Sequence, residues 1–178
     1  AIELARRAGP DGMVHGLDLN TDMVERARAR AEREGFGSRM RFDALNDDVL
    51  PVESGSVDVV VCKSVLEYVA DPAHCLREFS RVTRSGGRVH IIDSDWGMMV
   101  VEPLDDGSFS ELFSAASMAY HTPHIGRRLY GLARAAGLKD IQVKVLCAAD
   151  TTGIRAPVVR HMISYARESG SIDGQRLN

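Results

Sequence analysis

Short apolar runs alternate along the chain with segments of helical periodicity, and this alternation limits the fold more than any other feature. The runs at residues 13–19, 39–45, 57–62, 88–93 and 141–147 have the length and composition of buried strands. Helical patterns cover residues 1–9, 20–34, 110–120, 126–136 and 157–168, with another from residue 71 onward. Strands that alternate with helices of this length predict a mostly parallel sheet with helices on both faces, an α/β fold.

Residues with strong positional preferences mark the ends of two of these helices. Asn20 or Thr21 can cap the helix at 20–34, because the side-chain oxygen accepts a hydrogen bond from the first free N–H groups. Asp71 is expected to cap the following helix, with Pro72 at its first position. The glycine pair at 86–87 is expected to end that helix.

Composition is that of an ordinary globular domain. The chain has 178 residues, 44% of them hydrophobic and 26% charged, which is enough for one sizeable core. The net charge of -3, without a basic stripe interleaved with aromatics, does not favour a nucleic-acid partner. The scattered arginines alternate with acids, so we expect a solvated surface with local ion pairs.

The cysteines and the lack of long apolar runs indicate the environment. Cys62, Cys75 and Cys147 are far apart and form neither a metal-ligand pattern nor a disulfide framework. No apolar run approaches the ~20 residues of a membrane span, and the first residues have no signal-peptide pattern. We therefore expect a cytoplasmic protein with no metal, no membrane partner and no nucleic-acid partner. Its oligomeric state is not predictable from these features.

Polar residues follow three of the predicted strands, where ligands bind in open parallel sheets. Asp18 ends the first strand, and its carboxylate can accept both hydroxyls of a ribose, although a capping or solvated role explains it equally well. Asn46-Asp47-Asp48 offer an acceptor for the exocyclic amine of adenine, although a polar turn is the simpler explanation of this cluster alone. Cys62-Lys63-Ser64 follow the third strand, where backbone groups can face a cofactor.

Taken together, these segments resemble one enzyme family. The shared pattern comprises GLDLNTDMVERARARAE, an acidic loop ending in LP, and GSVDVVVCKSVLEYVADPAHCLREFSRVTRSGGRVHIID. It is similar to that of the class I S-adenosylmethionine-dependent methyltransferases of the ubiquinone/menaquinone-biosynthesis type (methyltransferase type 11), over residues 1–95. The resemblance implies a Rossmann-like, doubly wound sheet. It also implies S-adenosylmethionine as cofactor and methyl transfer to a small-molecule acceptor.

The resemblance implies adenosine-binding roles for residues after the first strand. Asp18 corresponds to the family's ribose-binding acid, with Leu19 and Met23 as apolar neighbours that pack on adenine. The glycine pair at 86–87 matches the turn before the family's fifth strand, which is a structural role. These are expectations drawn from the family and not from the spacing alone.

The same resemblance implies roles after the next two strands. Asn46 stands where the family usually has the Asp of a GDA motif, beside the adenine amine. An Asn carbonyl accepts the same hydrogen bond, so Asn46, Asp47 or Asp48 can fill this role. Cys62 and Lys63 are similar in position to residues that line the methionine end of the cofactor.

The resemblance further implies segments that the printed sequence does not contain. In the family's sheet order, 3-2-1-4-5-7-6, the central strand ends in an acid followed by GxGxG, and it would precede Ala1. The family's last strand has no counterpart either. We therefore expect a single, incomplete methyltransferase domain over residues 1–178. Residues 1–95 would form the cofactor-binding core, and residues 96–178 the substrate-lid helices and a late strand. Such a fragment is expected to fold marginally and to bind cofactor poorly.

The acceptor side of the predicted site is less defined. Asp95-Trp96 and Tyr120-His121 would face the acceptor, although lid packing and surface exposure are the simpler explanations of these pairs. A sulfonium methyl is already activated, so a general base is needed only for an acceptor that must lose a proton. His121 is the candidate for that base, and no residue is assigned as catalytic.

Two other classes of function fit parts of the sequence. Nicotinamide-dependent oxidoreductases also place an acid after a strand to bind ribose. The short-chain dehydrogenases among them need a Tyr followed four residues later by a Lys. The tyrosines of this chain are instead followed there by Pro72, His124, Arg134 and Ser169. A non-catalytic remnant or binding module of methyltransferase origin is the alternative if the protein begins near Ala1. The excess of Arg over Lys is typical of high-GC bacterial genomes.

Overall fold

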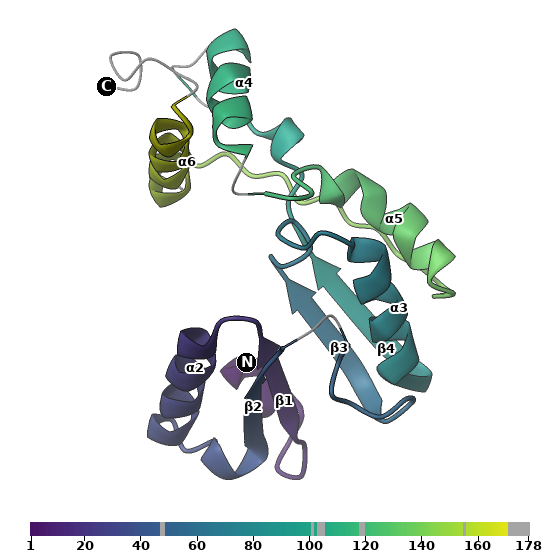
Figure 1. Cartoon of the computed structure of the whole chain (residues 1–178). Helices are drawn as coiled ribbons and strands as arrows, with labels where there is room; N and C mark the ends of the chain where they lie inside the picture. The colour runs from purple at the N-terminus through teal and green to yellow at the C-terminus, as the bar shows by residue number, and fades with distance from the viewer. Residues whose placement is uncertain (47–48, 101, 103–105, 118–119, 155, 171–178) are drawn as a thin grey trace. The chain divides into compact units, whose positions relative to one another are not determined.

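The computed structural model describes residues 1–46, 49–100, 102, 106–117, 120–154 and 156–170 (Figure 1). The chain divides into two compact units, residues 1–53 and residues 54–178. The boundary between them lies inside the segment 1–95 that the family resemblance assigns to the cofactor. Each unit contains one parallel strand pair with helices packed on it.

The first unit is built on strands β1 (Val14–Asp18) and β2 (Met40–Ala44), which pair in parallel. Helix α1 (Ile2–Arg7) precedes them, and α2 (Thr21–Arg33) and the short 3-10 helix η1 (Gly37–Arg39) connect them. The core of this unit is formed by apolar side chains from both helices and from β2. Its buried members are Ile2, Ala5, Val24, Ala31, Met40 and Phe42.

The start of α2 shows which of the two expected residues caps it. Asn20 is the N-cap, and its side-chain oxygen accepts hydrogen bonds from the backbone N–H groups of Asp22 and Met23. Thr21 is instead the first helical residue. After the helix, Gly35 adopts a left-handed conformation with φ of +75°, which glycine supplies without steric cost.

The second unit is built on strands β3 (Val57–Lys63) and β4 (Thr83–Ile92), which also pair in parallel. Helix α3 (Pro72–Val82) connects them, and the 3-10 helix η2 (Trp96–Met98) follows. Three further helices are α4 (Asp106–Ala115), α5 (Ile125–Ala135) and α6 (Ala156–Ser169). Helix α5 contacts α3, and α4 packs against α6 (Figure 1). Asp71 caps α3 as expected, accepting a hydrogen bond from His74 N–H at 3.0 Å.

The sequence suggested that the glycine pair at 86–87 ends α3, and this prediction is wrong. The helix ends at Val82, and β4 already begins at Thr83. The pairing of β3 with β4 shifts between Val57, which faces Thr83, and Val59, which faces Arg88. Because the chain between these contacts carries extra residues, the glycine pair occupies an irregularity within the strand. A Cβ at Gly87 would lie 2.8 Å from the Asp58 carbonyl oxygen, so the close approach of the strands requires glycine there.

The predicted strand at 141–147 is absent, which corrects the sequence-based expectation. These residues pair with no strand in the described part of the chain. Their apolar side chains are largely exposed, at 62% for Val143, 73% for Val145 and 89% for Leu146. An extended segment becomes a strand only where a neighbour supplies partners for its backbone groups. Residues 141–147 thus have the apolar pattern of a strand but no neighbouring strand to pair with among the described residues. Helix α4 also lies earlier than the expected 110–120.

Strand β3 is less buried than its near-continuous apolar run predicts. Val59 is 48% exposed and Val61 is 39% exposed, whereas Cys62 is buried. Among the described residues β3 pairs with β4 alone, and β1 pairs with β2 alone. Of the helices in the described ranges, none has the length and apolarity needed to cross a membrane.

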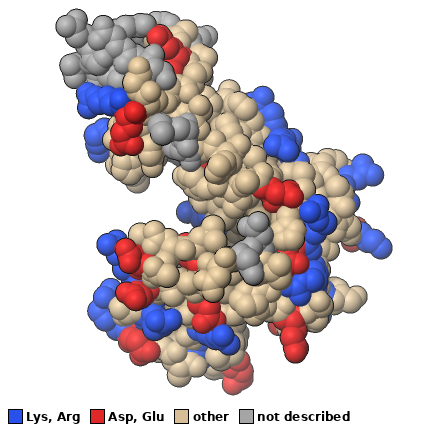
Figure 2. Space-filling model, in the orientation of Figure 1, with Lys and Arg blue, Asp and Glu red and all other residues tan. Residues whose placement is uncertain are grey.

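Charged side chains of both signs are interspersed on the visible face of the molecule (Figure 2). Many of them form local pairs on helices. Arg7 Nε lies 2.7 Å from Glu3 Oε1, and Arg30 Nε lies 2.8 Å from Glu34 Oε1. Both pairs are four residues apart, where side chains meet on a helix surface. The expectation of local ion pairs between arginines and acids is therefore confirmed for these helices.

Candidate functional site

The carboxyl end of the β1–β2 pair brings together most of the predicted adenosine-binding residues. Asp18 is the last residue of β1, and its carbonyl oxygen accepts a 2.8 Å hydrogen bond from Leu45 N–H, just beyond β2. Its carboxylate Oδ1 accepts a hydrogen bond from Asn20 N–H at 2.9 Å. Among the residues that the structure describes, no group pairs with Oδ2 of this exposed carboxylate. Asp18 can therefore accept hydrogen bonds from a ligand.

Two apolar side chains next to Asp18 are exposed to solvent. Leu19 is 61% exposed and Met23, in the first turn of α2, is 44% exposed. Large apolar side chains beside convergent polar groups are typical of ligand sites, because a bound ring covers them. Met23 is thus not part of the buried face of α2, to which Val24 and Ala31 contribute.

A pocket of about 240 Å³ adjoins this edge and is lined by Ala44, Leu45, Asn46, Val49 and Pro51. Asn46 is the polar side chain of this lining, and its amide oxygen can accept from an exocyclic amine. Asp47 and Asp48 lie outside the described residues. A carboxylate, two exposed apolar side chains and an amide beside an apolar pocket can together bind hydroxyl groups, an apolar ring and an exocyclic amine.

Cys62 and Lys63 belong to the second unit and end strand β3 there. Cys62 is buried, and burial raises the pKa of its thiol to about 12, so the side chain acts as a small apolar core residue. Lys63 is exposed. The loop that follows is held by Asp93, whose Oδ2 accepts hydrogen bonds from the N–H groups of Val65 and Leu66 at 3.3 and 2.9 Å. The buried Cys62 thiol is therefore not exposed to a ligand at this edge, and the N–H groups of Ser64, Val65 and Leu66 already have hydrogen-bond partners.

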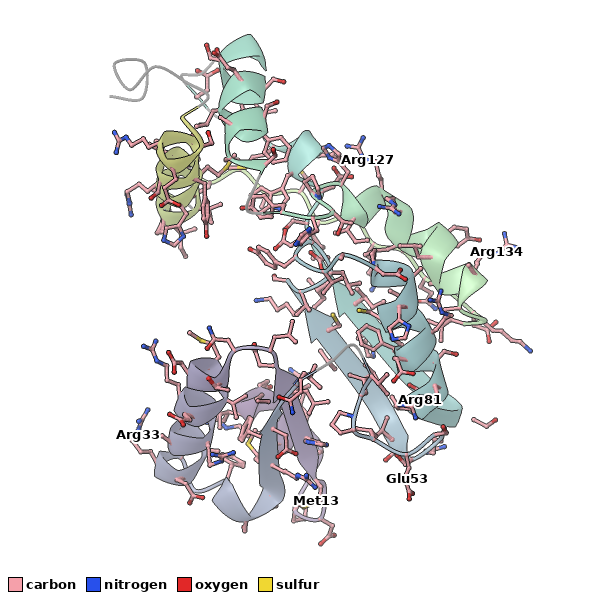
Figure 3. All side chains as sticks on the ribbon, viewed as in Figure 1. Met13, Arg33, Glu53, Arg81, Arg127 and Arg134 are labelled. Carbon is pink, nitrogen blue, oxygen red and sulfur yellow. The ribbon has the colours of Figure 1, made fainter. Side chains whose placement is uncertain are left out.

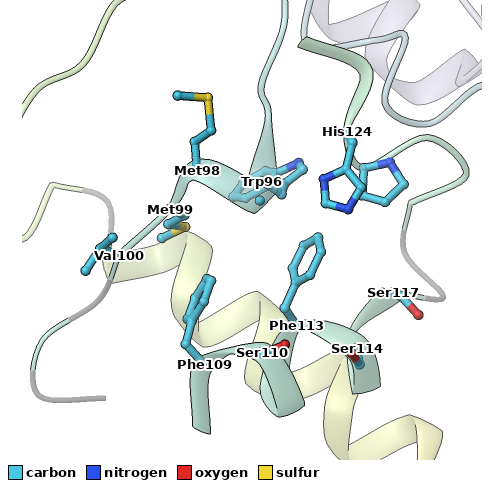
Figure 4. Close-up of a pocket in the computed structure, with 12 residues that line it drawn as sticks. Trp96, Met98, Met99, Val100, Phe109, Ser110, Phe113, Ser114, Ser117 and His124 are labelled. Carbon is cyan, nitrogen blue, oxygen red and sulfur yellow. The ribbon is translucent and has the colours of Figure 1, made fainter. Parts of the chain in front are cut away.

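A larger pocket of about 590 Å³ lies in the second unit, beyond the carboxyl end of β4 (Figure 4). We call it the aromatic pocket. Apolar and aromatic side chains predominate in its wall, and α4 adds a row of serines. The lining residues are Trp96, Gly97, Met98, Met99, Val100, Phe109, Ser110, Phe113, Ser114, Ser117, Pro123 and His124. A concave apolar wall with few polar groups is typical of small-molecule sites.

Glu67 is a buried acid behind the wall of the aromatic pocket, and the sequence analysis did not single it out. Glu67 is only 2% exposed, and its carboxylate accepts a short hydrogen bond from Trp96 Nε1–H. Burial raises the pKa of Glu67, and the nearby Asp93 raises it further. The Trp96 ring lies 5.1 Å from the Tyr120 ring, which stacks on Tyr68 at 5.4 Å. An acid within the apolar segment VLEYV was the available signal, since buried acids require a partner.

The residues predicted from sequence to face the acceptor differ in whether they line the aromatic pocket. Trp96 lines the aromatic pocket, whereas Asp95 lies behind it with a side chain that is 7% exposed. Asp95 binds Arg127, and hydrogen bonding to this guanidinium holds the pKa of the Asp95 carboxyl below its usual range. His121 is exposed, and the histidine that lines the pocket is His124.

Comparison with known proteins identifies the family of this chain. The sequence profile of a family described as "Methyltransferase domain" matches residues 1–137, more than half of the chain. The chain belongs to the methyltransferase-domain family. The matched range includes both strand pairs and the residues expected to bind the adenosine and the methionine end of the cofactor.

Relatives of this methyltransferase domain are found in bacteria. The chain is 32% identical over 112 residues to the ubiquinone/menaquinone biosynthesis C-methyltransferase UbiE of Hahella chejuensis, covering 62% of this chain and 45% of that protein. It is 37% identical over 93 residues to the demethylmenaquinone methyltransferase of Lactococcus lactis, covering 52% and 36%. An uncharacterized 37.1 kDa protein in transposon TN4556 of Streptomyces fradiae is 35% identical over 135 residues, covering 75% and 38%. The chain thus spans less than half of the length of these relatives.

Solved structures share the fold of this methyltransferase domain. A SAM-dependent methyltransferase from Aquifex aeolicus matches with a TM-score of 0.60 at 17% identity, covering 80% of this chain and 67% of that one. Phosphoethanolamine N-methyltransferase 2 of Haemonchus contortus, in complex with S-adenosyl-L-methionine, matches with a TM-score of 0.61 at 20% identity, covering 94% and 41%. The predicted Rossmann-like α/β fold is confirmed. The predicted family, with S-adenosylmethionine as its cofactor, is confirmed as well.

Proposed function

We propose that the protein transfers a methyl group from S-adenosylmethionine to a small-molecule acceptor bound in the aromatic pocket. The observation that carries this proposal is the pocket itself, an apolar cavity of about 590 Å³ directly beyond β4 in a methyltransferase domain. Open parallel sheets bind ligands beyond the carboxyl ends of their strands. We infer that residues 96–178 cover the acceptor and that residues 1–95 hold the cofactor.

On the cofactor side, the proposed roles come from the family resemblance, and the exposed groups at the end of β1 support them. Asp18 would accept hydrogen bonds from the ribose hydroxyls, while Leu19 and Met23 would pack on the adenine ring. Asn46 would accept from the adenine amine. The backbone beyond β3, at Cys62 and Lys63, would adjoin the methionine end. S-adenosylmethionine supplies an activated sulfonium methyl group in this arrangement.

On the acceptor side, the protein contributes orientation and exclusion of water. Methyl transfer from a sulfonium is an in-line displacement, so the alignment of the acceptor atom supplies much of the rate. The rings of Trp96, Phe109 and Phe113 form an apolar surface on which a flat or aliphatic acceptor can pack. The serines at 110 and 114 offer hydroxyls that can hold polar substituents in register.

The names of relatives support a small apolar acceptor. Two of them are named for ubiquinone, menaquinone or demethylmenaquinone, and another, 35% identical over 83 residues, is the 27-O-demethylrifamycin SV methyltransferase of Amycolatopsis mediterranei. Each name refers to a small organic compound. An aromatic-lined pocket favours such a compound where it has an apolar body, because burial of apolar surface drives its occupation.

The test is a titration of the full-length gene product with S-adenosylhomocysteine, followed by a radiolabelled methyl-transfer screen against quinols, phenols and macrolides. Binding of S-adenosylhomocysteine together with transfer to an apolar acceptor is the expected result. Binding without transfer to any acceptor would favour the alternative, a non-catalytic binding module of methyltransferase origin. An absence of binding would contradict the proposed function.

A further inference from the structure

We propose that His124 is the base that deprotonates the acceptor, and that the acceptor is a weakly acidic hydroxyl compound, a phenol or an enol, with an apolar body. The inference rests on the proposed function and concerns the same aromatic pocket. It assigns to His124 the role for which the sequence offered His121.

The first step is the position of the imidazole ring. His124 is half-buried and lines the aromatic pocket. Its ring centre lies 5.9 Å from that of Phe113, which points toward it from α4 (Figure 4). Trp96 lies in the same wall. An acceptor bound on these rings would therefore lie beside the imidazole, within reach of proton transfer.

The second step is the orientation of the ring. His124 Nδ1 lies 3.4 Å from Asp95 Oδ1. Asp95 is an acceptor only, because Arg127 keeps its carboxylate ionised through hydrogen bonds of 2.6 and 2.7 Å. An acceptor beside Nδ1 favours the tautomer that carries its proton there, which leaves the lone pair of Nε2 as the base. The same His–carboxylate logic orients bases in hydrolytic enzymes.

The third step is the space and the charge around the ring. A Cβ at Gly97 would lie 2.9 Å from His124 Nδ1 and 2.7 Å from Arg127 Nη2, so the absence of a side chain at Gly97 makes room for this arrangement. Among the described residues, the charged groups facing His124 are Asp95, at the start of η2, and Arg127, on α5. The α4 side contributes the uncharged Phe113.

The chemistry of the base restricts the class of acceptor. A phenolic hydroxyl has a pKa of about 10, so a neutral imidazole can take its proton while the bond to the methyl carbon forms. The acceptor oxygen gives its proton to Nε2 of His124, and its electron pair forms the bond to the methyl carbon. The electron pair of the broken carbon–sulfur bond stays on sulfur, which becomes neutral, and the products are the methyl ether and S-adenosylhomocysteine.

The experiment uses 4-nitrophenol as a probe and Trp96 as its reporter, in the full-length gene product without cofactor. Trp96 is the single tryptophan among the 178 residues and lines the pocket. The difference in fluorescence between the parent and Trp96→Phe isolates its signal, which an occupant of the pocket should quench. The visible colour of 4-nitrophenolate reports whether the bound probe has lost its proton. The expected result is quenching together with an apparent pKa of the probe that is lower than in water.

Variants separate the base from its neighbours. His124→Ala and His124→Gln should retain the quenching, but the apparent pKa of the bound probe should rise by about one unit or more, because the imidazole no longer takes the proton. The exposed His161→Ala variant, on α6, is the matched control and should bind and ionise the probe as the parent does. Once an acceptor that the protein methylates is known, His124→Ala should lower the turnover of methyl transfer to it about 100-fold or more.

Three results would overturn the proposal. Quenching without any change of the probe's pKa between parent and His124→Ala would remove His124 as the base. The loss of ionisation in His121→Ala instead would restore the histidine expected from sequence. The absence of quenching would exclude phenols from the pocket. Titration with S-adenosylhomocysteine is independent of all three, so failure of this inference is distinguishable from failure of the proposed function.

Discussion

Asp95 and Arg127 form a two-point ion pair between the segment after β4 and the first turn of α5. Arg127 Nε lies 2.6 Å from Oδ2 and Nη2 lies 2.7 Å from Oδ1, while the backbone N–H of Arg127 donates to Oδ2 at 3.2 Å. Figure 3 shows the Arg127 side chain near the start of α5. Because a planar guanidinium binds a carboxylate in one geometry, this pair fixes α5 relative to Trp96 and His124.

Asp95→Asn should destabilise the protein by about 1–3 kcal/mol at pH 7, because the paired carboxylate is replaced by a neutral amide. The pKa of Asp95 is lowered in the folded state, so its contribution is complete above the unfolded value of about 3.9 and is lost as pH falls through the folded value. Urea unfolding from pH 3 to pH 7 measures this difference. Asp11→Asn, at an exposed acid, is the control. A gap between parent and Asp95→Asn that is independent of pH would contradict the assignment.

Trp96→Phe should lower the free energy of unfolding by about 1–3 kcal/mol, because it removes the N–H group that donates a hydrogen bond to the buried carboxylate of Glu67. Glu67→Gln keeps an acceptor for Trp96 and removes the charge. Since the folded pKa of Glu67 is raised, the parent loses stability as pH rises above about 4.3, and the variant should gain on it toward pH 7. Thermal melts followed by circular dichroism at pH 4 and pH 7 provide the measurement. Glu67→Gln losing stability relative to the parent over this range would show that the charged form is favoured.

Asp18→Ala should weaken S-adenosylhomocysteine binding by the full-length gene product about 10- to 100-fold. The reason is the loss of charge-assisted hydrogen bonds to the ribose hydroxyls. Asp18→Asn should have an intermediate effect, because the amide retains one acceptor oxygen. Glu25→Gln, on the exposed side of α2, is the matched control and should change the affinity by no more than about twofold. Calorimetric titration distinguishes the variants, and equal affinities for Asp18→Ala and the parent would refute the ribose role.

Gly87→Ala should destabilise the second unit by about 1–3 kcal/mol, because the new methyl group would meet backbone oxygens of Asp58 and Arg84 at 2.8 and 2.9 Å. Gly131→Ala provides the opposite case within α5. Apart from the adjacent residues and the helix's own backbone, no atom of the described residues lies within 4 Å of the added methyl there. The variant should gain up to about 1 kcal/mol from its higher helix propensity. Equilibrium unfolding in urea measures both. Equal changes in the two variants would mean that strand contact at Gly87 has no special cost.

Local features of the fold were predictable from neighbouring residues. Asn20 and Asp71 cap their helices as expected, because a cap depends on the few residues around it. The end of α3 was not predictable in this way, because Gly86 and Gly87 suit a helix end and also the bulge that they occupy. Only the register between β3 and β4 distinguishes these outcomes.

The candidate site divides in the same way. Asp18 and Asn46 were recognised because each follows a strand, and the carboxyl ends of parallel strands share an edge. Glu67 and His124 were not recognised as site residues, because their significance depends on Trp96, Asp95 and Phe113, which come from other segments. Contacts between residues distant in sequence carry no local signature.

The sequence by itself determined the order of strands and helices up to residue 92 and the caps at Asn20 and Asp71, since these follow from periodicity and neighbouring residues. The family was recognised from the resemblance of several motifs to those of known methyltransferases. Tertiary structure alone decided that 141–147 forms no strand, because pairing requires a neighbour. It also decided that His124 and not His121 lines the aromatic pocket. The physical reason is that burial, pairing and orientation arise from packing between segments, which the one-dimensional pattern does not specify.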